Sequence, residues 1–312
     1  MSSLKLTDGA VTDGVLVLGL SFNPNKASAL TIESGTVTID TRTLLAQLKE
    51  LGATGKSDEV IKIPGTRTKL ILFTGLGITS KDYSHETLRR AAGAAARALA
   101  GSSEATFALP ATDIASVAAI AEGAALGAYA FDEFRGSTKL ERKLPLASIA
   151  IHSKFSKKVE AKSALKRAQI IAQYTHLVRD LINTPPSHLT PDSFTKKISA
   201  AVKAVGGSSS SLKVSILNEK QLKSGGYGGI IGVGQGSANP PRLLHVTYNP
   251  AKAKKRFAFV GKGITFDTGG LALKPAAGME AMKADMSGAA AVIASVFAIA
   301  QLKLPIAVDG WA

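Results

Sequence analysis

The sequence predicts an α/β protein: an N-terminal three-layer α/β domain and a second α/β domain, joined by a long helix. Short apolar runs alternate with amphipathic or Ala-rich segments in both halves, and a long amphipathic segment separates the halves. The 312 residues are enough for two cores of ordinary size. We place the N-terminal domain at 1–152, the linking basic segment and helix at 153–184, and the second domain at 185–312.

The first half alternates predicted strands and helices, which is the pattern of a three-layer α/β domain with a largely parallel or mixed sheet. Apolar runs bounded by turn residues predict buried strands at 15–20, 69–74, 106–109 and 146–151. Apolar residues at helical spacing, or Ala-rich composition, predict helices at 43–51, 85–100 and 114–129.

The linking helix is predicted to end at Asn183, because Pro185 and Pro186 cannot continue it. Thr190 followed by Pro191 is a typical helix start and predicts a helix to about residue 205. The same patterns predict the remaining elements of the second domain, which are strands at 212–217, 243–248, 257–266 and 305–308 and a helix at 288–302.

Composition excludes several classes of function. The chain contains no cysteine, which removes thiol nucleophiles, disulfide frameworks and Cys-ligated zinc, and is compatible with a reducing cytosol. No apolar segment follows Met1, so we expect no secretory signal. The apolar run at 288–302 is too short to cross a hydrocarbon core of ~30 Å and predicts a buried helix.

The net charge of +15 is concentrated in the second half, where residues 151–312 carry 22 basic and 8 acidic groups. Such asymmetry is typical of a surface that binds nucleic acid or a membrane. It also arises when an acidic part of the structure lies outside the chain. Aromatic residues make up only 5% of the chain, which gives little support to nucleic-acid binding.

Three familiar patterns do not hold. Gly55-Lys56-Ser57 resembles the end of a phosphate-binding loop, but Glu50 stands where the motif needs glycine, so we interpret it as a surface turn. The glycines of 232–236 are followed by prolines and a strand, which indicates a loop that needs positive φ or close backbone approach. The five histidines show no metal-binding spacing and are interpreted as structural or surface groups.

The informative segment is 260–288, in which two lysines, Lys262 and Lys274, and two aspartates, Asp267 and Asp285, lie among glycines. Lys262 and Asp267 lie near the end of the predicted strand 257–266, where open α/β sheets bind ligands. Asp285 precedes a predicted helix and, taken alone, is equally well explained as an N-cap. Carboxylates and lysines such as Lys274 in a Gly-lined pocket are costly unless ions satisfy them, so we predict a divalent metal site.

This segment resembles the cytosolic leucyl aminopeptidase family, which uses two divalent metal ions. The matching motifs are K-G-I-T-F-D-T-G-G-L-A-L-K-P at 262–275 and M-K-A-D-M-S-G-A-A at 282–290. The segments 180–186, 189–191 and 232–242 are also similar to the family, so the resemblance covers residues 177–312, with weaker agreement before it.

The resemblance implies a role for each of the four residues. Lys262 is the lysine ligand of one metal, Asp267 bridges both metals, and Asp285 is a further ligand of the lysine-bound metal. Lys274 is the catalytic lysine that polarises the scissile carbonyl. The implied activity is the release of N-terminal amino acids, with leucine-type preference, from peptides with a free N-terminus. The implied setting is a cytoplasmic homo-hexamer with two Mn²⁺ or Zn²⁺ ions per site.

The chain departs from the family in one respect. The family's second metal-binding motif, N-T-D-A-E-G-R, is absent from the 312 residues. We therefore expect an incomplete catalytic domain, a chain that is inactive by itself, and a basic charge that marks absent acidic ligands. The alternative is a non-catalytic protein of the same fold that binds nucleic acid or another polyanion through its basic second half.

Overall fold

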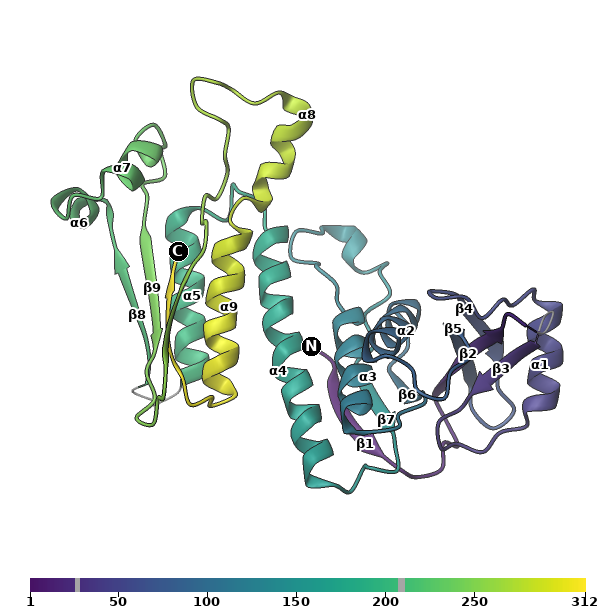
Figure 1. The fold of residues 1–312 in the computed structure, drawn as a ribbon. Helices are drawn as coiled ribbons and strands as arrows, with labels where there is room; N and C mark the ends of the chain where they lie inside the picture. Colours follow the sequence, from purple (N-terminus) through teal and green to yellow (C-terminus); the bar gives the residue numbers. More distant parts are fainter. Residues whose placement is uncertain (26–28, 207–210) are drawn as a thin grey trace. The chain divides into compact units, whose positions relative to one another are not determined.

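The computed structural model describes residues 1–25, 29–206 and 211–312. The chain forms two compact units, 1–173 and 174–312, each with its own sheet (Figure 1). The α/β class is therefore as the sequence predicts.

The sheet of the first unit has seven strands in the order β1-β7-β6-β2-β5-β4, with β3 paired to β2. Only the pairings β2–β3 and β4–β5 are antiparallel, so the sheet is mixed, as expected. The strands are β1 (Ser3–Thr7), β2 (Val15–Asn23), β3 (Ala29–Glu33), β4 (Val60–Pro64), β5 (Leu70–Ile78), β6 (Glu104–Ala108) and β7 (Ser148–His152).

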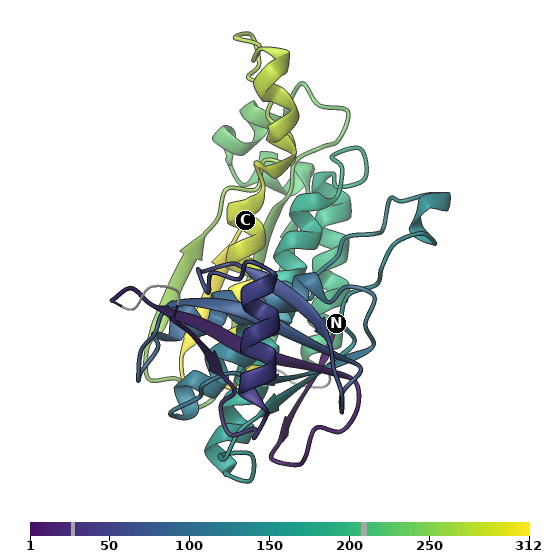
Figure 2. The same ribbon diagram turned by 90° about the vertical axis from the view of Figure 1, so that its right-hand side faces the viewer.

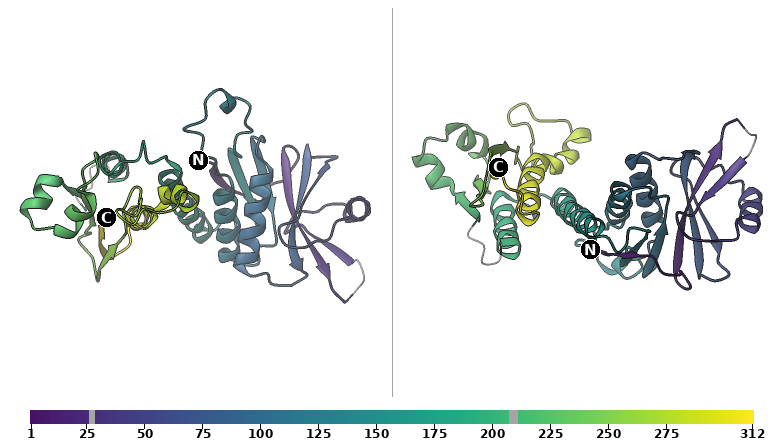
Figure 3. Two further views of the ribbon diagram at one scale, coloured as in Figure 1. Left: turned by 90° about the horizontal axis from the view of Figure 1, so that it is seen from above. Right: turned by 60° about the horizontal axis from the view of Figure 1, so that its bottom comes forward.

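Helices cover both faces of this sheet, which gives the predicted three layers. The helices are α1 (Thr41–Glu50), α2 (His85–Ala98) and α3 (Ile114–Gly127). Along β2, Val17 enters a core shared with α2 and α3, whereas Leu18 enters a second core that includes Leu48 of α1. Figure 2 shows α1 in front of the sheet, and Figure 3 shows α2 and α3 together along the other face. Burial of alternate residues on opposite faces explains the continuous apolar run of β2.

Strands β1, β3 and β4 are not predicted from the sequence. Each has five residues, most of them only partly buried, and each pairs with a single neighbouring strand. A short strand with one exposed face has no continuous apolar run, so its pairing partner, not its own sequence, determines the conformation.

The long linking helix is α4 (Val159–Asn183), and it ends at the predicted residue. The division between the two compact units falls within this helix, after Gln173. Ala168 belongs to a core of the first unit. Tyr174 belongs to the second unit, where its ring lies 5.9 Å from that of Phe297.

The second unit contains a four-stranded sheet in the order β10-β11-β9-β8, in which only β10–β11 is parallel. Helices α5 and α9 pack against this sheet and bury Val246, Val308 and Phe297. The elements are α5 (Pro191–Gly206), β8 (Leu212–Leu217), α6 (Glu219–Ser224), α7 (Gly228–Gly234), β9 (Leu243–Tyr248), β10 (Arg256–Val260), α8 (Ala276–Met279), α9 (Ser287–Gln301) and β11 (Ala307–Trp311).

Two expectations for this unit are wrong. The predicted strand 257–266 ends at Val260, because β10 pairs with β11 over five residues only. The glycine-rich segment, expected to be a loop, contains the short helix α7. Of the two expected reasons for these glycines, close approach applies at Gly234, where an added Cβ would lie 2.9 Å from the ring of Pro241.

One apolar segment, Ala276–Gln301, is long and apolar enough to span a membrane by length and composition alone. It consists of α8, a 3₁₀ turn (Glu280–Ala284) and α9. Helix α9 has 15 residues and rises about 22 Å, less than the ~30 Å hydrocarbon core. Its Ile293 and Phe297 are fully buried in the second unit, so α9 is a core helix, although Ala291 and Ser295 are exposed and the helix is not buried on all sides.

Candidate metal centre

The end of β10 is tied to the start of α9. Gly261 donates its N–H to the carbonyl of Trp311 in β11 (2.9 Å), and the carbonyl of Lys262 accepts from the N–H of Ala289 (2.9 Å). A Cβ added to Gly261 would lie 2.4 Å from the carbonyl oxygen of Gly288, so only glycine fits there. The side chain of Lys262 is thereby placed beside the residues that precede α9.

Lys262 pairs with Asp285, 23 positions further along the chain. Its Nζ lies 2.9 Å from Oδ2 of Asp285, whose side chain is 17% exposed. The Oδ2 atom is buried and has this ion pair but no hydrogen bond of acceptable geometry. The N-cap interpretation of Asp285 is wrong, because Met286 occupies the N-cap of α9 and makes no side-chain capping bond.

Lys274 pairs with Asp267 across a tight loop. Its Nζ lies 2.6 Å from Oδ2 and 3.2 Å from the main-chain oxygen of Asp267. The N–H of Gly269 donates to Oδ1 of Asp267 (2.9 Å), and the N–H of Lys274 donates to the carbonyl of Thr268 (2.9 Å). Gly269 has φ of 93°, and a Cβ there would lie 2.4 Å from the carbonyl oxygen of Ala272. Glycine at this position is what allows the loop to close.

The charge of Lys262, in the first ion pair, acts on Asp267 in the second. The pKa of Asp267 is held below its ordinary value, first by the hydrogen bond from Lys274 and next by the N–H of Gly269, against a smaller effect of burial. The charges of Lys274 and Lys262 lower this pKa further. The four residues predicted from 260–288 thus form two ion pairs, and the charge of Lys262 also acts on Asp267. Lys262 and Asp267 follow the strand instead of lying on it.

The donor set suits part of a metal centre. The buried Oδ2 of Asp285, which already faces the ammonium of Lys262, is a suitable donor for a cation, and Asp267 and Lys262 add a carboxylate and an amine. Across the described ranges, no three His, Cys, Asp or Glu side chains converge on one point. The residues thus fit an incomplete ligand set for one ion and do not suffice for two.

One further residue, Met282, contacts the site, whereas the acidic residue Asp309 is engaged elsewhere. The Sδ atom of Met282 lies 3.5 Å from Nζ of Lys274, and the only sequence signal for this contact is the position of Met282 in the 282–290 motif. Asp309, the remaining acidic residue after Asp285, accepts from His245 and Arg256 at 2.9 and 2.6 Å on the sheet. Its carboxylate is therefore already paired.

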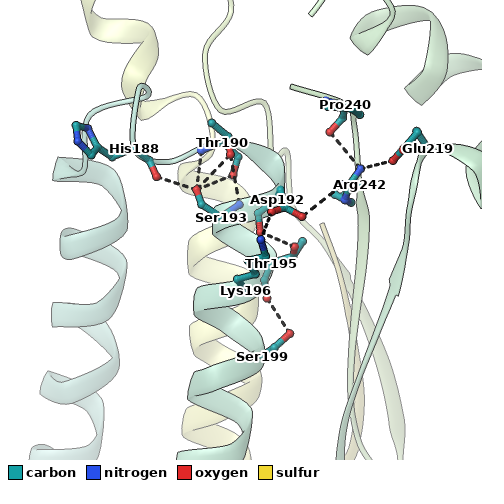
Figure 4. A network of polar contacts seen from close by, with 10 residues as sticks. All are labelled: His188, Thr190, Asp192, Ser193, Thr195, Lys196, Ser199, Glu219, Pro240 and Arg242. Carbon is teal, nitrogen blue, oxygen red and sulfur yellow. Dashed lines mark hydrogen bonds and ion pairs between the residues drawn. The ribbon is translucent and has the colours of Figure 1, made fainter. Parts of the chain in front are cut away.

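Two other segments that resemble the family meet in a polar network (Figure 4). Arg242 lies 2.6 Å from Glu219 in α6 and 3.4 Å from Asp192 in α5, and it also donates to the carbonyl of Pro241. Ser193 donates to the carbonyl of His188 and accepts from the N–H of Thr190, which fixes the start of α5. This network joins α5, α6 and the segment before β9, and we assign it a structural role.

Comparison with known proteins identifies both halves. Residues 176–312 match the catalytic domain of the cytosol aminopeptidase family, and residues 21–138 match the N-terminal domain of the same family. A probable cytosol aminopeptidase of Streptomyces avermitilis is 44% identical over the whole chain, and one of Streptomyces coelicolor is 46% identical over 86% of it. The chain spans 63% and 54% of the lengths of these two relatives.

The chain is also similar to solved structures of two enzymes. The bottromycin maturation enzyme BotP in complex with Mn is 31% identical, with a TM-score of 0.76 over 96% of this chain and 58% of that one. A mutant of tomato leucine aminopeptidase is 25% identical, with a TM-score of 0.77 over the whole chain and 62% of that protein.

Proposed function

The chain belongs to the cytosol aminopeptidase family, and on this premise we propose that it forms part of a metal-dependent aminopeptidase. The proposed enzyme releases N-terminal amino acids, with leucine-type preference, from peptides with a free N-terminus. The observation that carries the proposal is the pairing of Lys262 with Asp285 and of Lys274 with Asp267 in the segment between β10 and α9, with the Oδ2 atom of Asp285 buried.

Each residue has a proposed task. Lys262 and Asp285, already 2.9 Å apart, would hold one ion, and Asp267 would contribute an oxygen to both ions. Lys274 would donate to the oxygen of the scissile carbonyl and stabilise the negative charge that develops there. A bound divalent ion supplies Lewis acidity and lowers the pKa of water. Gly269 and Gly261 position Asp267 and Lys262 through the main-chain contacts described above.

The proposed cofactors are two Mn²⁺ or Zn²⁺ ions in the complete enzyme. Support for manganese comes from BotP, which binds Mn, and from the oxygen-rich donors here. The ligands of a second ion must come from residues other than the described donors, since these make an incomplete set for one. We accordingly propose that the chain of 312 residues is inactive by itself.

The proposed setting is a cytoplasmic homo-hexamer, which agrees with the names of the curated relatives as far as location is concerned. The polyanion-binding alternative is not favoured. Several cations of the basic second half are already ion-paired with carboxylates of that half, namely Lys196, Arg242, Arg256, Lys262 and Lys274. These cations are therefore less available to phosphate groups than the net charge implies.

A chimera tests the activity. Residues 1–312 would be joined to the remaining C-terminal part of the Streptomyces avermitilis relative and assayed with leucine p-nitroanilide and Mn²⁺ or Zn²⁺. We expect metal-dependent hydrolysis that Asp267→Ala lowers by about 100-fold or more, since it removes a metal ligand. Glu280→Ala, which removes an exposed carboxylate of the neighbouring 3₁₀ turn, should retain most of the activity. A folded chimera in which Asp267→Ala leaves hydrolysis unchanged would refute the role of Asp267.

A further inference from the structure

The ammonium of Lys274 lies where a cation would approach Asp267. Its Nζ is 2.6 Å from Oδ2, and it also contacts the main-chain oxygen of the same residue at 3.2 Å. The other carboxylate oxygen, Oδ1, accepts the N–H of Gly269. Both oxygens of Asp267 are thus engaged, and Oδ2 is engaged by a positive charge.

The loop between these two residues is held by bonds that do not involve the Lys274 side chain. Lys274 donates its main-chain N–H to the carbonyl of Thr268, and Gly269 donates its N–H to Oδ1 of the Asp267 side chain. The neighbouring Leu271 and Leu273 are exposed, and the side chains of Lys274 and Asp267 are only 33% and 30% exposed. Movement of the ammonium away from Oδ2 therefore requires a rotamer change, without unfolding of the loop.

The ion pair between Lys262 and Asp285 differs from that between Lys274 and Asp267 in the proposed tasks of its two members. Lys262 and Asp285 are both proposed ligands of the same ion, which would displace the proton that Lys262 now directs at Asp285 and bind both groups. Lys274 and Asp267 have different proposed tasks, because one acts on the substrate and the other binds metal. While Lys274 and Asp267 are in contact, Lys274 is not available to the substrate and this oxygen of Asp267 is not available to a metal ion.

We propose that Lys274 and a divalent ion compete for Oδ2 of Asp267, so that Lys274 turns toward the substrate only when the ion has taken this oxygen. The inference rests on the proposed metal site at Asp267. It makes metal occupancy the condition for the catalytic position of Lys274, because an oxygen that coordinates a dication no longer holds the ammonium by the same charge attraction. The metal-free enzyme would thus keep both groups unavailable to substrate.

The test measures, by isothermal titration calorimetry, the binding of Mn²⁺ to the chimera of residues 1–312 with the C-terminal part of the Streptomyces avermitilis relative. Lys274→Met removes the competing ammonium and should bind Mn²⁺ about three- to tenfold more tightly than the wild type. Lys274→Arg retains a cation that can pair with Asp267 and should bind no more tightly than the wild type. Lys283→Met removes a nearby charge that forms no ion pair within the described residues, and it measures the general effect of charge. Circular dichroism confirms that each variant is folded.

Asp267→Asn separates this inference from the proposed function. Weaker Mn²⁺ binding by Asp267→Asn together with tighter binding by Lys274→Met supports both. If Asp267→Asn binds weakly but Lys274→Met gains no more than Lys283→Met, the competition is refuted and the metal site stands. If Asp267→Asn binds like the wild type, or if no variant binds Mn²⁺, the metal site and the competition are both refuted. Binding that becomes measurable only in Lys274→Met supports the competition.

Discussion

The α-carbon of Gly261 packs against the carbonyl of Gly288, where an added Cβ would lie 2.4 Å from the oxygen. This contact joins the end of β10 to the first turn of α9 and places Lys262 within 2.9 Å of Asp285. The candidate site therefore depends on two glycines that carry no chemistry of their own.

Gly261→Ala should destabilise the second unit by about 1–3 kcal/mol, because a methyl group there overlaps with main-chain atoms that cannot move independently. The single tryptophan, Trp311, lies in β11 and reports unfolding of this unit by its fluorescence in urea. Gly278→Ala is the matched control, since no atom lies within 4 Å of its added Cβ. Equal urea midpoints for the two variants would contradict the proposed contact.

Tyr174→Phe should leave the second unit as stable as before or stabilise it by up to ~1 kcal/mol. The Tyr174 hydroxyl is buried and makes no hydrogen bond within the described part of the chain, so the phenylalanine variant loses no interaction. The ring contact with Phe297 is retained in this variant. A loss of more than 1 kcal/mol in urea unfolding would show that the hydroxyl has a partner.

The same residue predicts an alkaline pH dependence. Burial raises the pKa of Tyr174 to about 12, so the native state keeps this proton after the unfolded state has lost it. Its contribution to stability is present below pH 10 and is lost as the pH rises from about 10 to 12, by roughly 2 kcal/mol. Subtracting the Tyr174→Phe profile from that of the wild type isolates this contribution from those of other tyrosines. Parallel profiles would contradict the prediction.

Asp113→Ala should destabilise the start of α3 by about 1 kcal/mol, since Asp113 caps this helix by accepting from the N–H and hydroxyl of Ser116. These bonds lower the pKa of Asp113 from its ordinary value of 3.8, with the hydroxyl contributing most. The carboxylate's contribution is therefore present above pH 3.8 and is lost as the pH falls through the lowered value. Hydrogen exchange of the first-turn amides of α3 measures the effect. Asp113→Asn, which keeps an acceptor without a titrating charge, should show the smaller pH dependence.

Arg242→Met should destabilise the second unit by about 1–2 kcal/mol, because one guanidinium bridges Glu219, Asp192 and the carbonyl of Pro241. Arg242→Lys should recover only part of this loss, since an ammonium cannot reproduce the planar fork. Lys196→Met, which breaks a single i,i+4 pair on the surface, should cost no more than about 0.5 kcal/mol. Urea midpoints from Trp311 fluorescence rank the three variants, and a loss at Lys196 as large as that at Arg242 would contradict the bridging role.

The elements that could be predicted are those whose own residues repeat a strong pattern. Strand β2 is buried on both faces, and α4 carries a long apolar stripe that ends at two prolines, so both were found from the sequence. Strand β3 is short and only partly buried, so its sequence predicts a strand weakly, and the glycines of helix α7 disfavour a helix. Their conformations come from pairing with β2 in the first case and from packing of Gly234 on Pro241 in the second.

The sequence by itself determined the α/β class, the two-part organisation and the family resemblance, and it predicts the four candidate site residues, because these depend on local periodicity and on contiguous motifs. The tertiary structure alone decided that Lys262 pairs with Asp285 and Lys274 with Asp267, and that Asp309 pairs away from them. Pairing across 23 residues depends on how α9 returns against the end of β10. The glycine contact and backbone hydrogen bonds between those two elements set that geometry, and they act between residues that are distant in the chain.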